Sequence, residues 1–114
     1  MNTVTLEVRS LTDTLEDAVQ AMKSGRASAP RIAFDSPELL WKVLTAKRWV
    51  ILRALAGAGP VTIRAAARRV ERDVKAVHGD IQALLKAGIL SKTTDGKILF
   101  PFDAVRVDFL LKAA

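Results

Sequence analysis

Hydrogen-bonding side chains at helical spacing mark the stretch from residue 70 to 90, which reads VERDVKAVHGDIQALLKAGIL. Lys75, His78 and Gln82 follow one another at intervals of three and four residues, so they would share one face of a helix. Such side chains can contact base edges or phosphates of a nucleic acid. His78 and Asp80 cannot work as an acid–base pair, because residues two apart on a helix do not face each other. For His78 the alternative is a solvated side chain without a function.

The opposite side of the same stretch predicts a packed helix from Asp73 to Ala87, closed by Gly88 as a C-terminal cap. Its apolar residues recur at helical intervals and are expected to face inward: Val74, Val77, Ile81, Leu84 and Leu85. Gly79 costs about 1 kcal/mol relative to alanine inside a helix. Close approach of another molecule would explain that glycine, and a packing accommodation within the chain is the alternative.

Charge is distributed unevenly along the 114 residues, whose net charge is +6. Residues 1–40 carry four basic and six acidic side chains, whereas residues 41–100 carry twelve basic and four acidic ones. The resulting segment of net charge +8 suggests a polyanionic partner, because each cation docked on a phosphate releases counterions and strengthens binding. The alternative is a solvated basic face that only keeps the protein soluble.

Cations stand before and after the predicted helix Asp73–Ala87 in the sequence. Those on the short preceding helix, in the turn and at the hairpin tip are expected to contact the DNA backbone or an adjoining groove: Arg64, Arg68, Arg69, Arg72, Lys92 and Lys97. Asp95 at the tip is explained by turn formation. Four earlier cations lie outside this arrangement and are expected to be solvated: Lys42, Lys47, Arg48 and Arg53.

The first 44 residues predict alternating strands and helices. Strict alternation over Thr3–Arg9 predicts a half-buried strand. A short helix capped by Ser10 or Thr12 follows, with an apolar stripe of Leu11, Leu15, Ala18, Val19 and Met22. The segment KSGRASAP is expected to be a flexible link, RIAF a short strand, and DSPELLWKVL a helix with Ser36 at the N-cap and Pro37 at its first position.

After residue 44 the sequence predicts a helix capped by Thr45, with Val50, Ile51, Ala54 and Leu55 facing inward. After the stop at residues 57–60 come a short extended piece VTI, a short helix, the longer helix and a hairpin around TTDGK, in which Asp95-Gly96 favours a tight primed turn. AVRVDFLL predicts a last half-buried strand. This order is that of a winged helix-turn-helix within an α+β fold. We expect an N-terminal strand-helix-strand extension at 1–36, a DNA-binding domain at 37–103 and a C-terminal strand at 104–114.

Several classes of protein are excluded by what the chain lacks. It has no cysteine, hence no disulfide and no thiolate metal site, and a single histidine. It has no signal peptide and no run of about 18 apolar residues, so we expect a cytoplasmic protein without a membrane partner. It also lacks a glycine-rich phosphate loop, paired carboxylates and a nucleophile setting. The expectation is a protein that is not an enzyme and has no catalytic residue, cofactor or metal site.

A framework of residues from about Leu39 to Phe109 resembles a known family. The pattern LT.KR...L..L...GP..IR..AR...RD.K.VH.D...L...G, with the terminal PFDAVRVDF, is similar to small prokaryotic winged-helix transcriptional regulators that are MarR-like in their DNA-binding part. The resemblance implies a homodimer and, as in some members that look like antitoxins, binding of a neighbouring toxin and autoregulation of the operon. By matching position it places five residues in the DNA-contacting segment: Arg64, Arg68, Arg72, Lys75 and His78.

Two hypotheses for the function follow. The leading one is a sequence-specific, double-stranded-DNA-binding transcriptional regulator, a repressor, that reads the major groove with the helix Asp73–Ala87 and binds a roughly palindromic operator as a homodimer. The alternative is an antitoxin or protein-interaction module, in which the strands Val4–Val8 and Val105–Leu111 offer free edges to a toxin or a second copy. Pairing of those strands with each other inside one chain is the competing arrangement.

Overall fold

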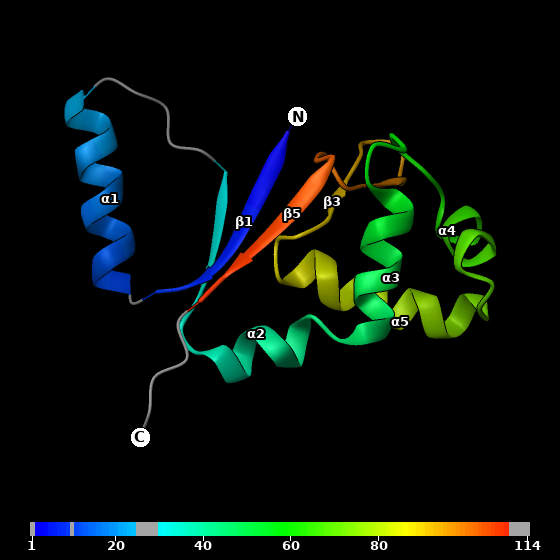
Figure 1. Cartoon of the computed structure of the whole chain (residues 1–114). Helices are drawn as coiled ribbons and strands as arrows, with labels where there is room; N and C mark the ends of the chain where they lie inside the picture. The colour runs from blue at the N-terminus through cyan, green and yellow to red at the C-terminus, as the bar shows by residue number, and fades with distance from the viewer. Residues whose placement is uncertain (1, 10, 25–29, 110–114) are drawn as a thin grey trace.

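A three-stranded parallel sheet separates one helix from the rest of the protein in the computed structural model, which describes residues 2–9, 11–24 and 30–109 (Figure 1). The strands are β1 (Thr3–Val8), β2 (Arg31–Phe34) and β5 (Ala104–Asp108), in the order β2-β1-β5. Val4 lies opposite Val105 and Leu6 opposite Val107 in the β1–β5 register. The predicted strands are confirmed, although the last one ends at Asp108, and residues 110 and 111 of that prediction lie outside the described part of the chain.

The position of β1 at the centre of the sheet decides how the terminal strands pair. β1 is bonded to β2 on one side and to β5 on the other, so the N- and C-terminal strands pair within one chain. The expectation that Val4–Val8 offers a free edge is therefore wrong, because both edges of β1 are occupied. Asn2 reinforces the pairing, since its backbone N–H donates to the carboxylate of Asp103 at 3.1 Å and its side-chain amide donates to the carbonyl of Pro101 at 2.7 Å.

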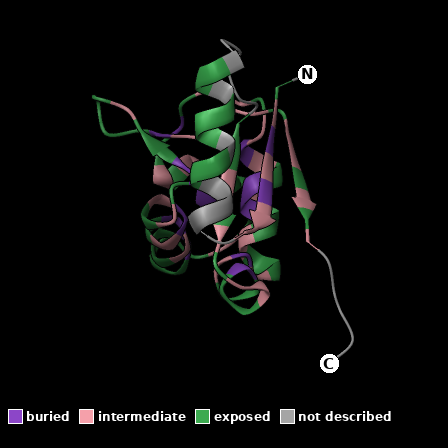
Figure 2. Ribbon diagram, turned by 90° about the vertical axis from the view of Figure 1, so that its left-hand side faces the viewer, coloured by how far each residue is buried: buried purple, intermediate pink, exposed green. Residues whose placement is uncertain are grey.

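Helix α1 (Leu11–Ser24) connects β1 to β2 and lies across the sheet from the other helices, as two perpendicular views show (Figures 1 and 2). The apolar stripe predicted for it does not pack inward. Leu15, Val19 and Met22 are all exposed, Met22 to 82%. The side chain of Leu11 and the caps proposed at Ser10 and Thr12 lie outside what the structure describes, as does most of the predicted link, residues 25–29.

On the other side of the sheet lie four helices, α2 (Pro37–Val43), α3 (Ala46–Leu55), α4 (Ile63–Val70) and α5 (Val74–Lys86), and the first two start at the predicted caps. The hydroxyls of Ser36 and Thr45 accept hydrogen bonds from backbone N–H groups three residues ahead, at 3.2 and 3.3 Å. Asp73 caps α5 in the same way, accepting from Lys75 and Ala76. The end of α5 also follows the prediction, because Gly88 has a left-handed φ of 81°.

The hairpin of β3 (Ser91–Lys92) and β4 (Ile98–Leu99) is confirmed, but its predicted primed turn is wrong. A primed turn of type I′ needs a positive φ at both central residues, and only Gly96, at 83°, has one. The observed turn is wider and runs from Thr93 to Lys97. Two hydrogen bonds hold it: the N–H of Thr93 donates to the carbonyl of Lys97 at 2.8 Å, and the N–H of Gly96 donates to the carbonyl of Thr93 at 3.0 Å. The predicted extended piece VTI joins this sheet through Val61, which exchanges two backbone hydrogen bonds with Ile98.

One continuous core joins the sheet to the helices (Figure 2). Its largest fully buried side chain is Phe100, and it includes Ile81 and Leu84 of α5. Two residues expected inside are at the surface: Val50 is 48% and Val74 43% exposed. On α3 the buried side is formed instead by Ile51, Leu52 and Leu55, so the inward face is shifted from the one predicted. No helix in the three described ranges combines the length and the apolar content needed to cross a bilayer.

Candidate functional site

Helix α5 is divided lengthwise into a buried and an exposed side. Val77, Ile81 and Leu84 have no exposed surface. Lys75, His78 and Gln82 are confirmed as exposed, and Gly79 and Lys86 are exposed beside them. An added Cβ at Gly79 would meet nothing within 4 Å, so packing inside the described part of the chain does not require this glycine. The outer side of α5 therefore presents the ammonium groups of Lys75 and Lys86, the imidazole of His78 and the amide of Gln82, with no side chain at Gly79.

Asp80 is the single acidic residue within Val74–Lys86, and it is turned away from that outer side. Its carboxylate is held between two arginines: Arg48 Nε donates to Oδ1 at 3.0 Å, and Arg72 Nη1 lies 2.9 Å from Oδ2. The side chain of Asp80 is only 17% exposed. We call these three residues the Arg48–Asp80–Arg72 cluster. Because of the cluster, the outer side of α5 carries no competing negative charge of its own.

Arg48 belongs to a structural contact, which corrects the expectation that it is solvated. Its Nη1 also donates to the backbone carbonyls of Val43 at 3.0 Å and Lys42 at 3.4 Å. These carbonyls are at the end of α2, where a helix leaves its last C=O groups without internal partners. One guanidinium thus connects the end of α2, the first turn of α3 and the middle of α5.

The charge of Asp80 is stabilised by its two neighbours. Burial raises the pKa of this carboxyl group, but the hydrogen bond from Arg48 and the positive charge of Arg72 lower it by more, so the pKa lies below its ordinary value. Asp80 is therefore ionised at neutral pH, and the cluster carries one net positive charge.

Arg72 also departs from the expected position beside a DNA backbone, because its guanidinium points to Asp80. It lies in the short connection between α4 and α5, where Glu71 adopts a left-handed conformation with φ 55° and ψ 47°. The N–H of Arg72 donates to the carbonyl of Ala67 at 3.1 Å, which closes α4. The cluster and this turn together set the orientation of α5 relative to α4.

The remaining predicted cations are exposed: Arg64, Arg68, Arg69, Lys92 and Lys97. Arg69 Nη1 donates a long hydrogen bond, 3.4 Å, to the carbonyl of Ala54. At the hairpin tip Lys97 Nζ is 3.8 Å from Asp95. The hydroxyl of Thr93 donates to Asp95 and is the main reason that the pKa of Asp95 is lowered. Asp95 thus organises the turn, as its sequence context predicted.

A second surface was not anticipated from the sequence. An open apolar groove of about 690 Å³ lies where α2, α3 and β5 meet, lined by Trp41, Leu44, Thr45, Ala46, Trp49, Val50 and Val107. Trp41 is 54% exposed and packs edge-on against Phe109, with ring centroids 5.5 Å apart. The sequence signal was a tryptophan on each side of the Thr45 cap.

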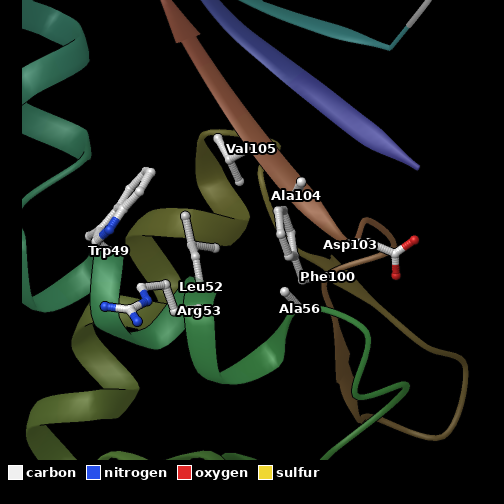
Figure 3. Close-up of a pocket in the computed structure, with 8 residues that line it drawn as sticks. All are labelled: Trp49, Leu52, Arg53, Ala56, Phe100, Asp103, Ala104 and Val105. Atoms are coloured by element: carbon white, nitrogen blue, oxygen red, sulfur yellow. The ribbon is translucent and has the colours of Figure 1, made fainter. Parts of the chain in front are cut away.

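Trp49 also lines a small pocket of about 90 Å³. Figure 3 shows Trp49, Leu52 and Arg53 of α3 on one side of this pocket and Ala104 and Val105 on the other. Phe100 lies between them and forms the floor with the core. Trp49 thus lines two hollows, the groove beside α2 and this pocket beside the C-terminal strand.

The described residues define a compact α+β protein with an exposed, cation-bearing helix face above a charged cluster. The chain belongs to the HVO_A0114 family, whose model matches residues 43–107, more than half of its length. The matched part runs from the last residue of α2 into β5 and contains the Arg48–Asp80–Arg72 cluster and α5, whereas β1, α1 and β2 lie outside it. No curated protein matches the chain.

Proposed function

We propose that the protein is a sequence-specific, double-stranded-DNA-binding transcriptional regulator whose helix α5 lies in the major groove. The observation that carries the proposal is the division of α5: Lys75, His78 and Gln82 face outward, while Asp80 is neutralised on the inner side. A helix in the major groove needs hydrogen-bonding tips on a slim surface and a positive potential toward the phosphates. The outer side of α5 meets these requirements, and Gly79 permits close approach.

The arrangement around α5 supports a winged helix-turn-helix. Helix α4, the short turn with Glu71 and helix α5 follow one another, and the β3–β4 hairpin comes directly after. The hairpin is anchored to the body by the Val61–Ile98 pair, as a wing beside a reading helix would be. In this proposal residues 37–103 form the DNA-binding unit. The parallel β1–β5 pairing places the C-terminal strand in one sheet with the N-terminal extension.

The other cations receive roles that match their positions. Arg64, Arg68 and Arg69 on α4 would contact phosphates, which fixes the register of the protein without reading sequence. Lys92 and Lys97 would place the hairpin against an adjoining groove. Arg72 is a positioning residue, because it holds Asp80 and, through it, α5.

Selection from random DNA duplexes tests the proposal directly. The purified protein is mixed with a pool of random duplexes, and the bound fraction is sequenced over successive rounds. We expect enrichment of one short sequence, followed by a footprint on that sequence, because base-edge contacts distinguish the four base pairs in the major groove. Binding of duplexes without enrichment would reduce the proposal to non-specific DNA binding, and absence of binding would overturn it.

Charge reversal on α4 is expected to weaken binding to every duplex to a similar degree. In Arg68→Glu a phosphate-contacting cation becomes an anion, so we expect the slope of log affinity against log salt to fall by about one or more. The measurement is a salt titration of affinity on the selected and on a scrambled duplex. Arg106→Glu on β5 makes the same change of charge at another exposed site and should alter both affinities much less. Equal effects of the two variants would show that only net charge matters.

A further inference from the structure

The apolar groove between α2 and α3 is accompanied by cations that have no role in the proposed duplex-binding face. We propose that this groove binds single-stranded DNA, whose bases stack on the indoles of Trp41 and Trp49. The phosphates of the strand lie against the neighbouring cations Lys42, Lys47 and Arg53. None of the residues that line the groove belongs to α4, α5 or the β3–β4 hairpin, so this site does not rest on duplex binding.

Both indoles of the groove offer surface on which a base can stack. Trp41 is 54% exposed and Trp49 36%. The ring of Trp41 meets that of Phe109 at an angle of 85°, so Phe109 covers at most one of its two faces. Stacking of bases on aromatic side chains is the contact by which proteins hold unpaired strands without reading their sequence. One tryptophan on each helix thus gives two stacking positions within one groove.

Cations stand next to both indoles. Lys42 follows Trp41 in the last turn of α2. On α3, Lys47 lies in the first turn, and Arg53 lies one turn beyond Trp49, with which it lines the small pocket of Figure 3. All three cations are exposed, and none of them is paired with a carboxylate of the described residues. Positive charge beside an aromatic, apolar groove is the combination that binds a phosphate backbone together with its bases.

Negative charge is scarce in this part of the chain. The segment 41–53, WKVLTAKRWVILR, contains two indoles and four cations but no aspartate or glutamate. Arg48 is the fourth cation, and it is neutralised by Asp80. Glu38 is the single acidic residue of α2 and lies in its first turn. The potential around the groove therefore attracts a polyanion.

The lining of the groove favours an unpaired DNA strand over a duplex or RNA. Paired bases are stacked on their neighbours, so only unpaired bases can lie flat on a side chain. Apart from the two indole N–H groups, Thr45 supplies the one polar side-chain group of the lining, and its oxygen already accepts the N–H of Arg48 at 3.3 Å. The lining therefore offers little to a ribose 2′-hydroxyl, which costs free energy to remove from water without a hydrogen bond.

An acidic protein segment would match the charge of this surface as well. An extended segment would bring its backbone N–H and C=O groups onto a lining of mostly apolar side chains, which offers them few partners. A base carries its polar groups along its edge, so it keeps them in water at the open mouth of the groove while its face covers an indole. The chemistry of the groove therefore favours nucleic acid.

The fluorescence of the chain reports on this groove directly, because Trp41 and Trp49 are its two tryptophans and both line it. An oligothymidylate of about eight nucleotides, which forms no duplex, is titrated into the full chain at low salt. We expect saturable quenching of the indole emission, since a stacked base quenches it. An oligouridylate of the same length should bind more weakly.

Substitution of Trp41 separates stacking from simple apolar contact. Affinity is measured by the anisotropy of a labelled oligothymidylate. Trp41→Leu keeps an apolar side chain but has no ring, so it should weaken binding by at least about 5-fold, the lower end of the loss of one base–aromatic stack. Trp41→Phe keeps a ring and should lose less. Equal affinities of the two variants would exclude stacking on this residue.

Charge reversal beside the groove gives a second readout that leaves its apolar lining unchanged. Lys47→Glu places an anion in the first turn of α3, where the helix dipole tolerates it, so the fold should be kept. The slope of log affinity against log salt should fall by about 0.7 or more, the value for one phosphate contact on a single strand. Arg106→Glu makes the same change of charge on the face of β5 opposite Val107 and should alter affinity much less. Equal effects of the two variants would show that only net charge matters and would overturn the site.

Each other outcome overturns the proposal in a recognisable way. Absence of both binding and quenching at tens of micromolar excludes a strand and leaves the groove to an acidic protein segment. Binding without quenching places the strand on other cations. An oligouridylate that binds at least as tightly assigns the groove to RNA. The Lys75→Ala/His78→Ala double variant should bind oligothymidylate as the unmodified chain does, so a failure of duplex selection would leave these results unchanged.

Discussion

Replacing both Lys75 and His78 by alanine is expected to lower the ratio of affinities for the selected and a scrambled duplex by about 30-fold or more. The fold should stay intact. Both side chains are exposed on α5, so their truncation leaves the buried side formed by Val77 and Ile81 untouched. A good base-edge contact discriminates by about 1–3 kcal/mol, and two such contacts are lost. The measurement is affinity for the selected against a scrambled duplex, with thermal unfolding recorded for the same samples.

Lys86→Ala is the matched control for this pair. Lys86 is an equally exposed cation on the same helix, but it lies in the last turn of α5, whereas Lys75 lies in the first. It should lower affinity for both duplexes by a similar small factor through lost phosphate attraction. If the footprint of the Lys75/His78 double variant is unchanged, α5 is not the reading helix, and the proposed orientation on DNA is wrong.

Asparagine at position 80 is expected to lower the free energy of unfolding by about 2 kcal/mol at neutral pH, the size typical of hydrogen bonds to charged groups. The substitution keeps the shape of the side chain but removes the charge that holds Arg48 and Arg72. Both guanidinium groups are mostly covered, so their loss of a counter-charge is only partly compensated by water. Denaturant unfolding followed by tryptophan fluorescence gives the value, because Trp49 lies on α3 one residue from Arg48.

The pH dependence of the same variant identifies the charge as the cause. The pKa of Asp80 is lowered in the folded protein, so its contribution to stability is present above the pKa of the unfolded chain, about 4. As the pH falls through the lowered pKa of the folded state, that contribution is lost. The stability difference between the unmodified chain and Asp80→Asn should therefore be full at pH 7 and shrink in acid.

Asp108→Asn serves as the reference, since it removes a carboxylate that is exposed on β5. Its stability should stay close to that of the unmodified chain throughout the titration. A difference between the unmodified chain and Asp80→Asn that stays constant from pH 7 to pH 2 would indicate a packing defect, and the electrostatic account of the cluster would then fail.

Local features of the chain were determined by the sequence alone. The caps at Ser36 and Thr45 lie where their short polar side chains predicted them, because capping depends on residues only two or three positions away. The two sides of α5 and the stop at Gly88 followed from periodicity and from the freedom of glycine at positive φ. The turn at Asp95-Gly96 shows the limit, since its place was predicted but its conformation was not.

The tertiary structure decided which charges are available and which surfaces remain uncovered. Asp80 is separated from Arg48 by 32 residues, and no spacing rule joins them, so Arg48 and Arg72 could not be told from the exposed cations around them. Contacts between distant segments likewise decide that β1 is the central strand, that α1 is exposed, and that a groove forms between Trp41 and Trp49. Helical and strand periodicity shows which side of an element is apolar, but only the assembled chain shows whether that side is already packed. For this protein, α5 is packed on its apolar side, and α1 is not.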